Sequence, residues 1–173
     1  GFEFDKTSAD VLFVTSIGKT GPVKEYNDKV EASEQMKTGQ YIVAVNGVER
    51  ISKGMAEELA KASKVELSIV RPQCFTIAIS KAKKESLGLK FAQSPASAII
   101  TAVEAGPALE WNKAHTNLEV KAGDRIVAVN GSRATGKEQM KLLQKDGSLQ
   151  LVVSRPCPPA GVAGAIRHLW DWF

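Results

Sequence analysis

Few residues in this chain of 173 are of the types that catalysis requires. General acid–base and nucleophilic mechanisms need a polar side chain within hydrogen-bond reach of a second one. The only histidines are His115, in a polar loop, and His168, near the C-terminus. The carboxylate pair Glu57-Glu58 falls on a predicted helix surface, where exposure to solvent explains it. The sequence therefore predicts a protein that is not an enzyme.

Metal and cofactor chemistry has no motif in the sequence either. The two cysteines, Cys74 and Cys157, each lie just after an Arg-Pro pair and lack the spacing of a zinc site. The glycines are scattered among turns instead of forming a phosphate loop, and no Gly-x-Ser-x-Gly elbow occurs. We predict no cofactor, no metal and reduced cysteines.

The composition is that of an ordinary globular protein, with 43% hydrophobic and 24% charged residues and a net charge of +4. Basic and acidic residues alternate along most of the chain, and aromatic residues make up only 6%. One basic cluster, Lys81 with Lys83 and Lys84, falls in a predicted loop. Nucleic-acid binding is therefore not predicted. No apolar run reaches the roughly 20 residues that a membrane-spanning helix needs.

An internal repeat divides the chain. The hexapeptide IVAVNG occurs at residues 42–47 and again 84 residues further on, at 126–131. Arg71-Pro72 recurs as Arg155-Pro156 at the same offset. A period this long indicates a duplicated domain and not a solenoid repeat. We expect an N-terminally incomplete domain at 1–72, a complete one at 75–156, and a Pro/Gly linker with an aromatic tail at 157–173.

The complete second copy carries strand and helix patterns. Gly106-Pro107 is typical of a helix start, and Asn130-Gly131 of a hairpin turn. The predicted helices begin at Pro107 and cover 137–145. Alternating or β-branched segments predict strands at 75–80, 89–92, 98–103, 125–129 and 148–154. This order predicts an α+β fold of two small, partly open β-barrels or sandwiches, each flanked by two helices, plus the short tail.

Several of these segments resemble the PDZ family. The matching residues are SLGL at 86–89, IITAV at 99–103, GPA at 106–108 and LEVKAGDRIVAVNG at 118–131. The resemblance covers residues 1–72 and 75–156, with the unpermuted element order of animal PDZ domains. It implies a peptide-binding module that adds a ligand segment to its sheet as an extra strand.

The resemblance implies a binding site in the second copy. The loop around Gly88 would present backbone N–H groups to a peptide carboxylate, while Leu87 and Leu89 would line an apolar pocket. Lys83 or Lys84 would strengthen carboxylate binding. Gly88→Val is expected to abolish binding and leave the fold largely intact. The alternative is a plain hairpin turn with two core leucines. The full predicted set is Ser86, Leu87, Gly88, Leu89, Lys90, Phe91, Lys83, Lys84, Gly136 and Met140.

The first copy is the weaker candidate for a groove. Half of its glycine loop and its first strand are absent from this chain, and its Gly-Asp pair is altered to Gly39-Gln40. Neither helix start, Gly136 or Ser52, is the histidine that would favour Ser or Thr in a ligand, so the peptide class stays open. The residues expected to line this second groove are Gly1, Phe2, Phe4, Ser52 and Ala56.

The tail is a docking candidate because it gathers apolar and aromatic residues on a segment too short to fold alone. The residues concerned are Leu169, Trp170, Asp171, Trp172 and Phe173. It could cover the chain's own domains, or a partner protein or membrane interface. As a third option its last three residues could occupy a PDZ groove, in this chain or in a neighbour.

Two functions remain open at this level. The first is a scaffold that binds protein C-termini or extended segments. The second is an accessory structural subunit of a larger complex, organellar and membrane-bound, that uses its PDZ folds and tail to contact neighbouring subunits. A third, the regulatory part of a protease, disagrees with the unpermuted order. The sequence leaves the compartment open between the cytoplasm and an organelle reached with a processed N-terminus, and we expect a protein inside the cell, peripheral to a membrane.

Overall fold

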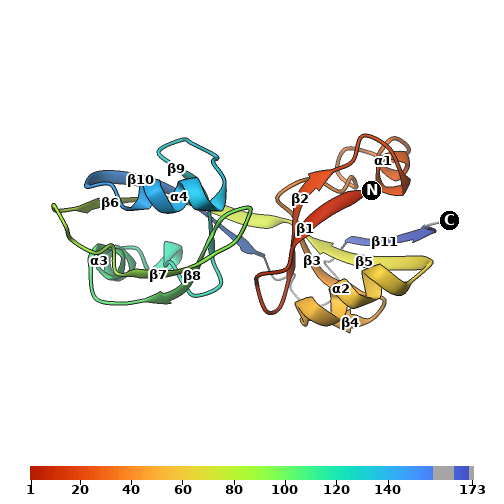
Figure 1. The fold of residues 1–173 in the computed structure, drawn as a ribbon, viewed down its shortest axis with the longest axis horizontal. Helices are drawn as coiled ribbons and strands as arrows, with labels where there is room; N and C mark the ends of the chain where they lie inside the picture. Colours follow the sequence, from red (N-terminus) through yellow and green to blue (C-terminus); the bar gives the residue numbers. More distant parts are fainter. Residues whose placement is uncertain (158–165, 172–173) are drawn as a thin grey trace. The chain divides into compact units, whose positions relative to one another are not determined.

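The computed structural model describes residues 1–157 and 166–171, which form two units (Figure 1). Unit 1 comprises Gly1–Pro72 together with Pro156–Phe173, and unit 2 comprises Gln73–Arg155. Each unit has its own antiparallel sheet and its own buried apolar cluster. None of the helices in the described part of the chain is long and apolar enough to cross a membrane.

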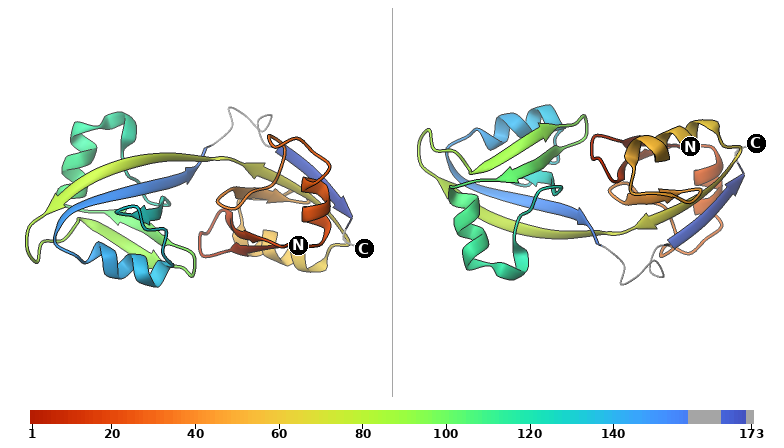
Figure 2. Two further views of the ribbon diagram at one scale, coloured as in Figure 1. Left: turned by 90° about the horizontal axis from the view of Figure 1, so that it is seen from above. Right: turned by 90° about the horizontal axis from the view of Figure 1, so that it is seen from below.

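Unit 2 is a five-stranded sheet with two α-helices and a short 3-10 helix. The strands follow the order β6-β10-β9-β8-β7, so that β7 lies at one edge. Figure 2 shows the long strands β6 and β10 side by side. The helices are α3 (Pro107–Ala114), η1 (Thr116–Leu118) and α4 (Gly136–Leu143). The strands are β6 (Pro72–Lys81), β7 (Leu89–Gln93), β8 (Ala98–Val103), β9 (Arg125–Val129) and β10 (Gly147–Pro156).

Unit 1 repeats most of this plan. Its sheet follows the order β1-β2-β3-β5-β11, with the short β4 paired to β3. The helices are α1 (Pro22–Asn27) and α2 (Ser52–Lys61). The strands are β1 (Phe2–Asp5), β2 (Leu12–Ile17), β3 (Tyr41–Val45), β4 (Val48–Glu49), β5 (Lys64–Val70) and β11 (Ile166–Asp171). The last strand comes from the tail and pairs antiparallel with β5.

Local sequence explains why these elements form where they do. In β6 the buried residues Ile77 and Ile79 alternate with exposed ones, as a half-buried strand requires. Asn130 and Gly131 both have positive φ, 49° and 78°, which is the backbone of a two-residue type I′ turn. The equivalent Asn46 and Gly47 have φ of 49° and 80°. The repeated IVAVNG segment thus builds the same strand and turn in each unit.

The fold class predicted from the sequence is confirmed: two antiparallel sheets and four α-helices form an α+β structure. The element order in unit 2 is the predicted one. Helix α4 ends at Leu143, two residues before the predicted end, and the 3-10 helix at Thr116–Leu118 was not predicted. His115, expected in a polar loop, ends α3 and stacks on Trp111 with ring centroids 3.7 Å apart.

Candidate functional site

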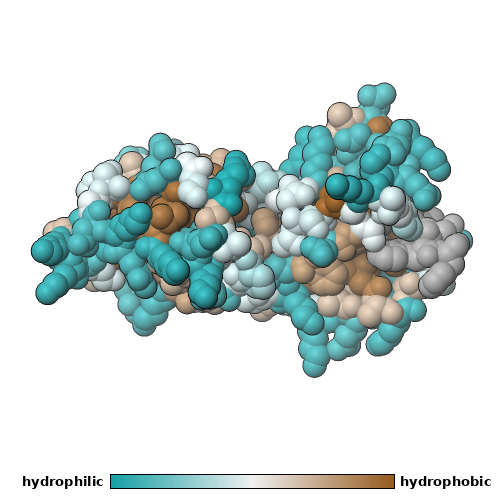
Figure 3. Space-filling model, turned by 45° about the horizontal axis from the view of Figure 1, so that its top comes forward, coloured by the Kyte–Doolittle hydropathy of each residue, from teal (hydrophilic) through white to brown (hydrophobic). Residues whose placement is uncertain are grey.

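A cavity of about 410 Å³ opens in unit 2 between β7, α4 and the loop that joins β6 to β7. Most apolar side chains of the cavity come from β7 and α4, at spacings that place them on one face of each element, and Leu87 comes from the loop. Leu89 and Phe91 are two residues apart on β7, and Met140 and Leu143 are three apart on α4. The full lining is Lys81, Lys84, Glu85, Ser86, Leu87, Leu89, Phe91, Met140, Leu143, Gln144 and Asp146. Figure 3 shows apolar surface among hydrophilic side chains on unit 2.

The walls of this cavity belong partly to the core. Leu87 and Leu89 are buried, and Leu143 is buried in the same apolar cluster. Phe91 and Met140 are only half-buried and pack against that cluster from the cavity side. Both half-buried side chains therefore keep apolar surface that a ligand could cover.

The loop depends on a glycine at position 88. Gly88 has φ +73°, and its carbonyl accepts a hydrogen bond from the N–H of Glu104 at 2.8 Å. A Cβ on Gly88 would lie 2.8 Å from the Glu104 carbonyl oxygen and 3.1 Å from the Cα of Gly106. Gly88→Val would therefore strain the loop against neighbouring backbone, which corrects the expectation that this substitution leaves the fold largely intact.

The same loop offers hydrogen-bond donors at the cavity. The Gly88 N–H donates to the Ser86 hydroxyl oxygen at 3.2 Å. Within residues 1–157 and 166–171, the backbone N–H groups of Ser86 and Leu87 have no acceptor. Converging N–H groups on a turn make a site that suits an anionic oxygen such as a peptide carboxylate.

A buried lysine that sequence reasoning missed stands beside this loop. Lys81 has a side chain only 7% exposed, and its ammonium donates to the carbonyls of Gln144 at 3.1 Å and Glu85 at 3.3 Å. It lies 3.5 Å from a carboxylate oxygen of Asp146, which also accepts from the Lys84 N–H at 3.2 Å. The signal was present in the alternation of β6, which continues past Ile79 onto Lys81.

The other end of the groove is closed by backbone contact. The Gly136 N–H at the start of α4 donates to the Pro95 carbonyl at 3.2 Å. A Cβ on Gly136 would lie only 2.0 Å from the Ser94 carbonyl oxygen, so the first turn of α4 lies directly on the β7–β8 turn. The side chain of Gln139 joins the two by accepting from the Ala98 N–H at 2.9 Å. A peptide between β7 and α4 therefore has room only toward the loop end.

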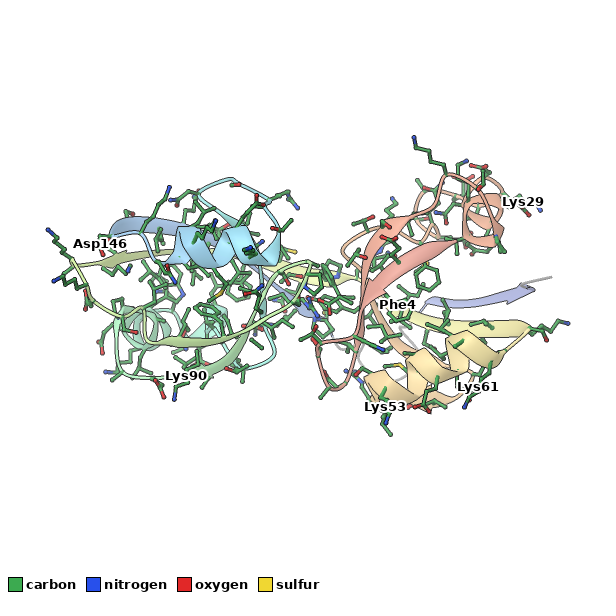
Figure 4. All side chains as sticks on the ribbon, viewed as in Figure 1. Phe4, Lys29, Lys53, Lys61, Lys90 and Asp146 are labelled. Carbon is green, nitrogen blue, oxygen red and sulfur yellow. The ribbon has the colours of Figure 1, made fainter. Side chains whose placement is uncertain are left out.

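The structure brings six of the ten residues predicted for this site into the lining of one cavity, namely Lys84, Ser86, Leu87, Leu89, Phe91 and Met140. Gly88 shapes the loop, Gly136 closes the far end, and Lys83 is exposed. Lys90 projects from β7 away from the cavity and pairs with Glu104 at 2.5 Å (Figure 4). Sequence reasoning also missed Glu85, Leu143, Gln144 and Asp146, which follow the predicted residues closely along the chain.

Unit 1 carries counterparts of several groove residues of unit 2. The Gly1 carbonyl accepts from the Gly18 N–H at 2.8 Å, as Gly88 does from Glu104, so the two glycines are equivalent. Gly1 is thus the first residue of the described chain that corresponds to the unit 2 loop. Phe2 and Phe4 lie on β1 with ring centroids 5.8 Å apart. Figure 4 labels Phe4 on this strand. Both rings pack against the apolar cluster of unit 1.

The remaining predicted residues of unit 1 also contact its interior. Ser52 starts α2, and its N–H donates to the Ala9 carbonyl at 2.9 Å in the β1–β2 turn. This bond repeats the one between Gly136 and Pro95 in unit 2. Ala56 packs against the apolar cluster. The helix start is thus joined to the strand turn in both units.

The tail lies on unit 1 at the edge opposite β1. Residues Ile166–Asp171 pair with β5 from Ile69 to Lys64. Strand β1 is at the other end of the same sheet, so the described part of the tail is not beside the β1 groove. Trp172 and Phe173, the last two residues of the suggested groove ligand, lie outside the described residues.

Some solved structures are similar to this chain. No protein-family model matches the chain, and no curated protein matches it. Among solved structures, INAD PDZ45 in complex with the NG2 peptide covers 91% of this chain and 84% of its own, with 19% identity and a TM-score of 0.44. These similar structures are PDZ domains. The fourth PDZ domain of MUPP1 covers 51% of this chain and 80% of its own, with 19% identity and a TM-score of 0.42.

A second structure of INAD PDZ45, in complex with NORPA CC-PBM, covers 91% of this chain and 89% of its own. Its identity to this chain is 18% and its TM-score 0.43.

Proposed function

We propose that this chain is a non-enzymatic tandem PDZ protein, and that unit 2 binds the C-terminal ends of protein partners by strand addition to β7. The observation that carries the proposal is the position of the cavity. It lies at the loop end of β7, and β7 is an edge strand of its sheet. An extended peptide can therefore continue the sheet while its terminus enters the cavity.

The chemistry of the C-terminal residue of such a peptide, both its carboxylate and its side chain, follows from the site. The terminal carboxylate accepts from the N–H groups of Ser86 and Leu87, and the exposed Lys84 of the lining adds positive charge near the loop. The terminal side chain covers Phe91 and Met140 and is therefore apolar. Each part of the cavity thus has a matching part in an apolar C-terminal residue.

The closed end of the groove limits what the site can distinguish. The contact of Gly136 with Ser94 leaves no side chain at the helix start to select a ligand residue. Strand addition is then confined to the segment of β7 nearest the loop, around Leu89 and Phe91. We infer that unit 2 selects mainly for the terminal residue and its free carboxylate. In this proposal the peptide site is assigned to unit 2.

The test is a binding titration of the full chain with short fluorescent peptides that end in Val, Leu or Phe. Each peptide is made with a free carboxylate and as the C-terminal amide. We expect the amide to bind at least about 10-fold more weakly, because it loses charge-assisted hydrogen bonds worth about 1.5–3 kcal/mol. Equal affinity of acid and amide for every peptide would contradict carboxylate capture.

A matched pair of variants locates the site. Met140→Asp places a carboxylate in the cavity wall, and Ala56→Asp places one at the equivalent position of α2 in unit 1. We expect M140D to weaken binding by about 10-fold or more through charge repulsion and lost apolar contact, and A56D to leave it unchanged. Loss of binding in A56D with normal binding in M140D would assign the site to unit 1.

A further inference from the structure

The edge of unit 1 formed by β5 holds the tail where unit 2 holds its first strand. In unit 2 the last strand, β10, pairs with β6, the strand that precedes the loop. In unit 1 the equivalent last strand, β5, pairs with β11 from the end of the chain. Both last strands lead into an Arg-Pro pair, Arg71-Pro72 and Arg155-Pro156, which confirms that they correspond.

The backbone of β5 has unmet hydrogen-bonding capacity unless this edge is covered. The N–H and carbonyl of Glu66 both bond to Asn46, on the β3 side. Because backbone groups of alternate residues point to opposite sides of a strand, those of Val65, Leu67 and Ile69 point to the β11 side. The register pairs these three with Trp170, His168 and Ile166.

The side chains of the same β5 residues belong to the interior. Val65 and Leu67 are 0% exposed and Ile69 is 1% exposed. If nothing paired with β5, water would reach the backbone of these buried residues, and the unpaired backbone groups could bind a strand of another chain. The strand that covers β5 is therefore part of what keeps unit 1 folded.

The start of the tail is anchored at the same end of β5 where β11 begins. The Cys157 N–H donates to the Arg71 carbonyl at 3.3 Å, and Ile166 pairs with Ile69. Cys157 and Ile166, which flank residues 158–165, therefore both lie near one end of β5. A tether this short holds the strand at an effective concentration on the order of millimolar, which favours the chain's own tail over a second copy.

We propose that the β5 edge of unit 1 is a second strand-accepting site, separate from the unit 2 cavity, and that the tail strand Ile166–Asp171 is its tethered occupant. The site takes an extended segment antiparallel to β5. The tail then pairs with β5 at the edge that corresponds to the one where β6 pairs with β10 in unit 2. This assignment does not depend on peptide binding by unit 2.

The test uses two proline variants in the full chain. His168→Pro removes an N–H that faces β5, opposite Leu67. Leu169→Pro removes one that faces outward, where an edge strand tolerates proline. Hydrogen exchange at the amides of Val65, Leu67 and Ile69 should speed up at least about 10-fold in H168P and stay close to native in L169P. The unit 2 amides serve as the internal reference.

A fluorescent peptide of residues 164–173 completes the test. It should bind H168P and restore slow exchange in β5, even if H168P has unfolded unit 1, and it should not bind the native chain, whose site is filled. Native β5 exchange rates in both variants would overturn the proposal. So would a peptide that binds neither variant, or one that binds the native chain as tightly as H168P.

Discussion

Units 1 and 2 bury different side chains at the start of the same strand. Tyr41 in unit 1 is 1% exposed, and its ring lies 5.2 Å from that of Phe13. The equivalent residue of unit 2 is Arg125, which is 0% exposed and donates to the Ser97 hydroxyl at 2.9 Å. One unit therefore fills this position with an aromatic pair and the other with a polar cluster under the β7–β8 turn.

The backbone around this position is the same in both units. The Gly39 N–H donates to the Val14 carbonyl at 2.8 Å, and the Gly123 N–H donates to the Ile100 carbonyl at 2.8 Å. Together with the repeated bonds of Gly1 and Gly88, these show that the plan is held by main-chain contacts and glycines. Side chains in the interior could change as long as they filled the space and satisfied their hydrogen bonds.

The Gly39-Gln40 pair, which replaces the Gly-Asp pair of unit 2, also keeps the main-chain structure of its turn. Asp124 accepts from the Lys121 N–H at 2.8 Å and pairs with Arg155 at 2.7 Å. Gln40 takes the first of these roles, because its amide oxygen accepts from the Lys37 N–H at 2.7 Å. The substitution therefore preserves the turn and is no sign of a degenerate unit. The two units differ in what pairs with the last strand: β6 pairs with β10 in unit 2, and the tail strand β11 pairs with β5 in unit 1.

The largest expected effect is a loss of stability when the buried side chain at this position is removed from one unit. Arg125→Ala empties a large buried site and leaves the Ser94 and Ser97 hydroxyls without this donor. We expect it to lower the free energy of unfolding of unit 2 by about 3 kcal/mol or more. Tyr41→Ala should cost unit 1 a similar amount. Urea unfolding followed by residue-resolved NMR assigns each loss of unfolding free energy to its unit. A loss of stability in the unmutated unit would contradict the expectation that each substitution affects only the unit that contains it.

The next effect tests whether Asp124 can be replaced as Gln40 suggests. Asp124→Ala leaves the Lys121 N–H and the Arg155 guanidinium without this acceptor, so we expect a loss of about 2 kcal/mol. Asp124→Asn keeps an acceptor of the same shape and should cost less than about 1 kcal/mol. Chemical denaturation of the two variants measures the difference. Equal losses would mean that the charge, and not the acceptor, matters.

A smaller effect concerns the helix starts. Helix α4 begins with a capping box of Thr135 and Glu138, whereas the equivalent residue of α2 is Ile51, which is 58% exposed and caps nothing. Thr135→Ala should cost unit 2 about 1 kcal/mol, and Ile51→Thr should stabilise unit 1 by a similar or smaller amount. Thermal unfolding checks both. Destabilisation by I51T would show that the exposed isoleucine has another role.

The smallest expected effect is a difference in pH dependence. Burial raises the pKa of Asp124 above its ordinary value of 3.8, outweighing the lowering by the Lys121 N–H and by Arg155. Folded unit 2 then holds this proton more tightly than the unfolded chain, so its free energy of unfolding falls as pH rises through the range just above 3.8. The D124N variant should lose this slope, as measured by denaturation between acidic and neutral pH. An unchanged slope would assign it to another group.

Much of the fold followed from local sequence. The repeated IVAVNG segment predicted the duplicated strand and turn, and helical spacing placed Met140 beside the groove. The burial of Lys81 was missed because a charged residue at the end of a strand normally marks the start of a loop. The contact of Gly136 with Ser94 depends on two segments that are distant in sequence. Local pattern carries no information about such an approach.

The pairing of the tail was beyond sequence reasoning for a related reason. The segment from Ile166 to Asp171 has no local signal that chooses β5 over solvent or a partner. Its position depends on the edge of β5, which belongs to the first unit and lies far away in the sequence. Strand partners are chosen by the whole sheet and not by the strand itself.

The central claim, that unit 2 and not unit 1 captures a peptide carboxylate, is tested most directly by an NMR titration of the isotope-labelled chain. The probe is the tightest free-acid peptide among those ending in Val, Leu or Phe. We expect the largest amide shifts at Ser86 and Leu87, smaller ones along β7, and none in β1 or α2, with the amide form of the peptide producing none of these shifts. Shifts centred on Phe2 and Phe4, or equal shifts with the acid and the amide, would contradict the claim.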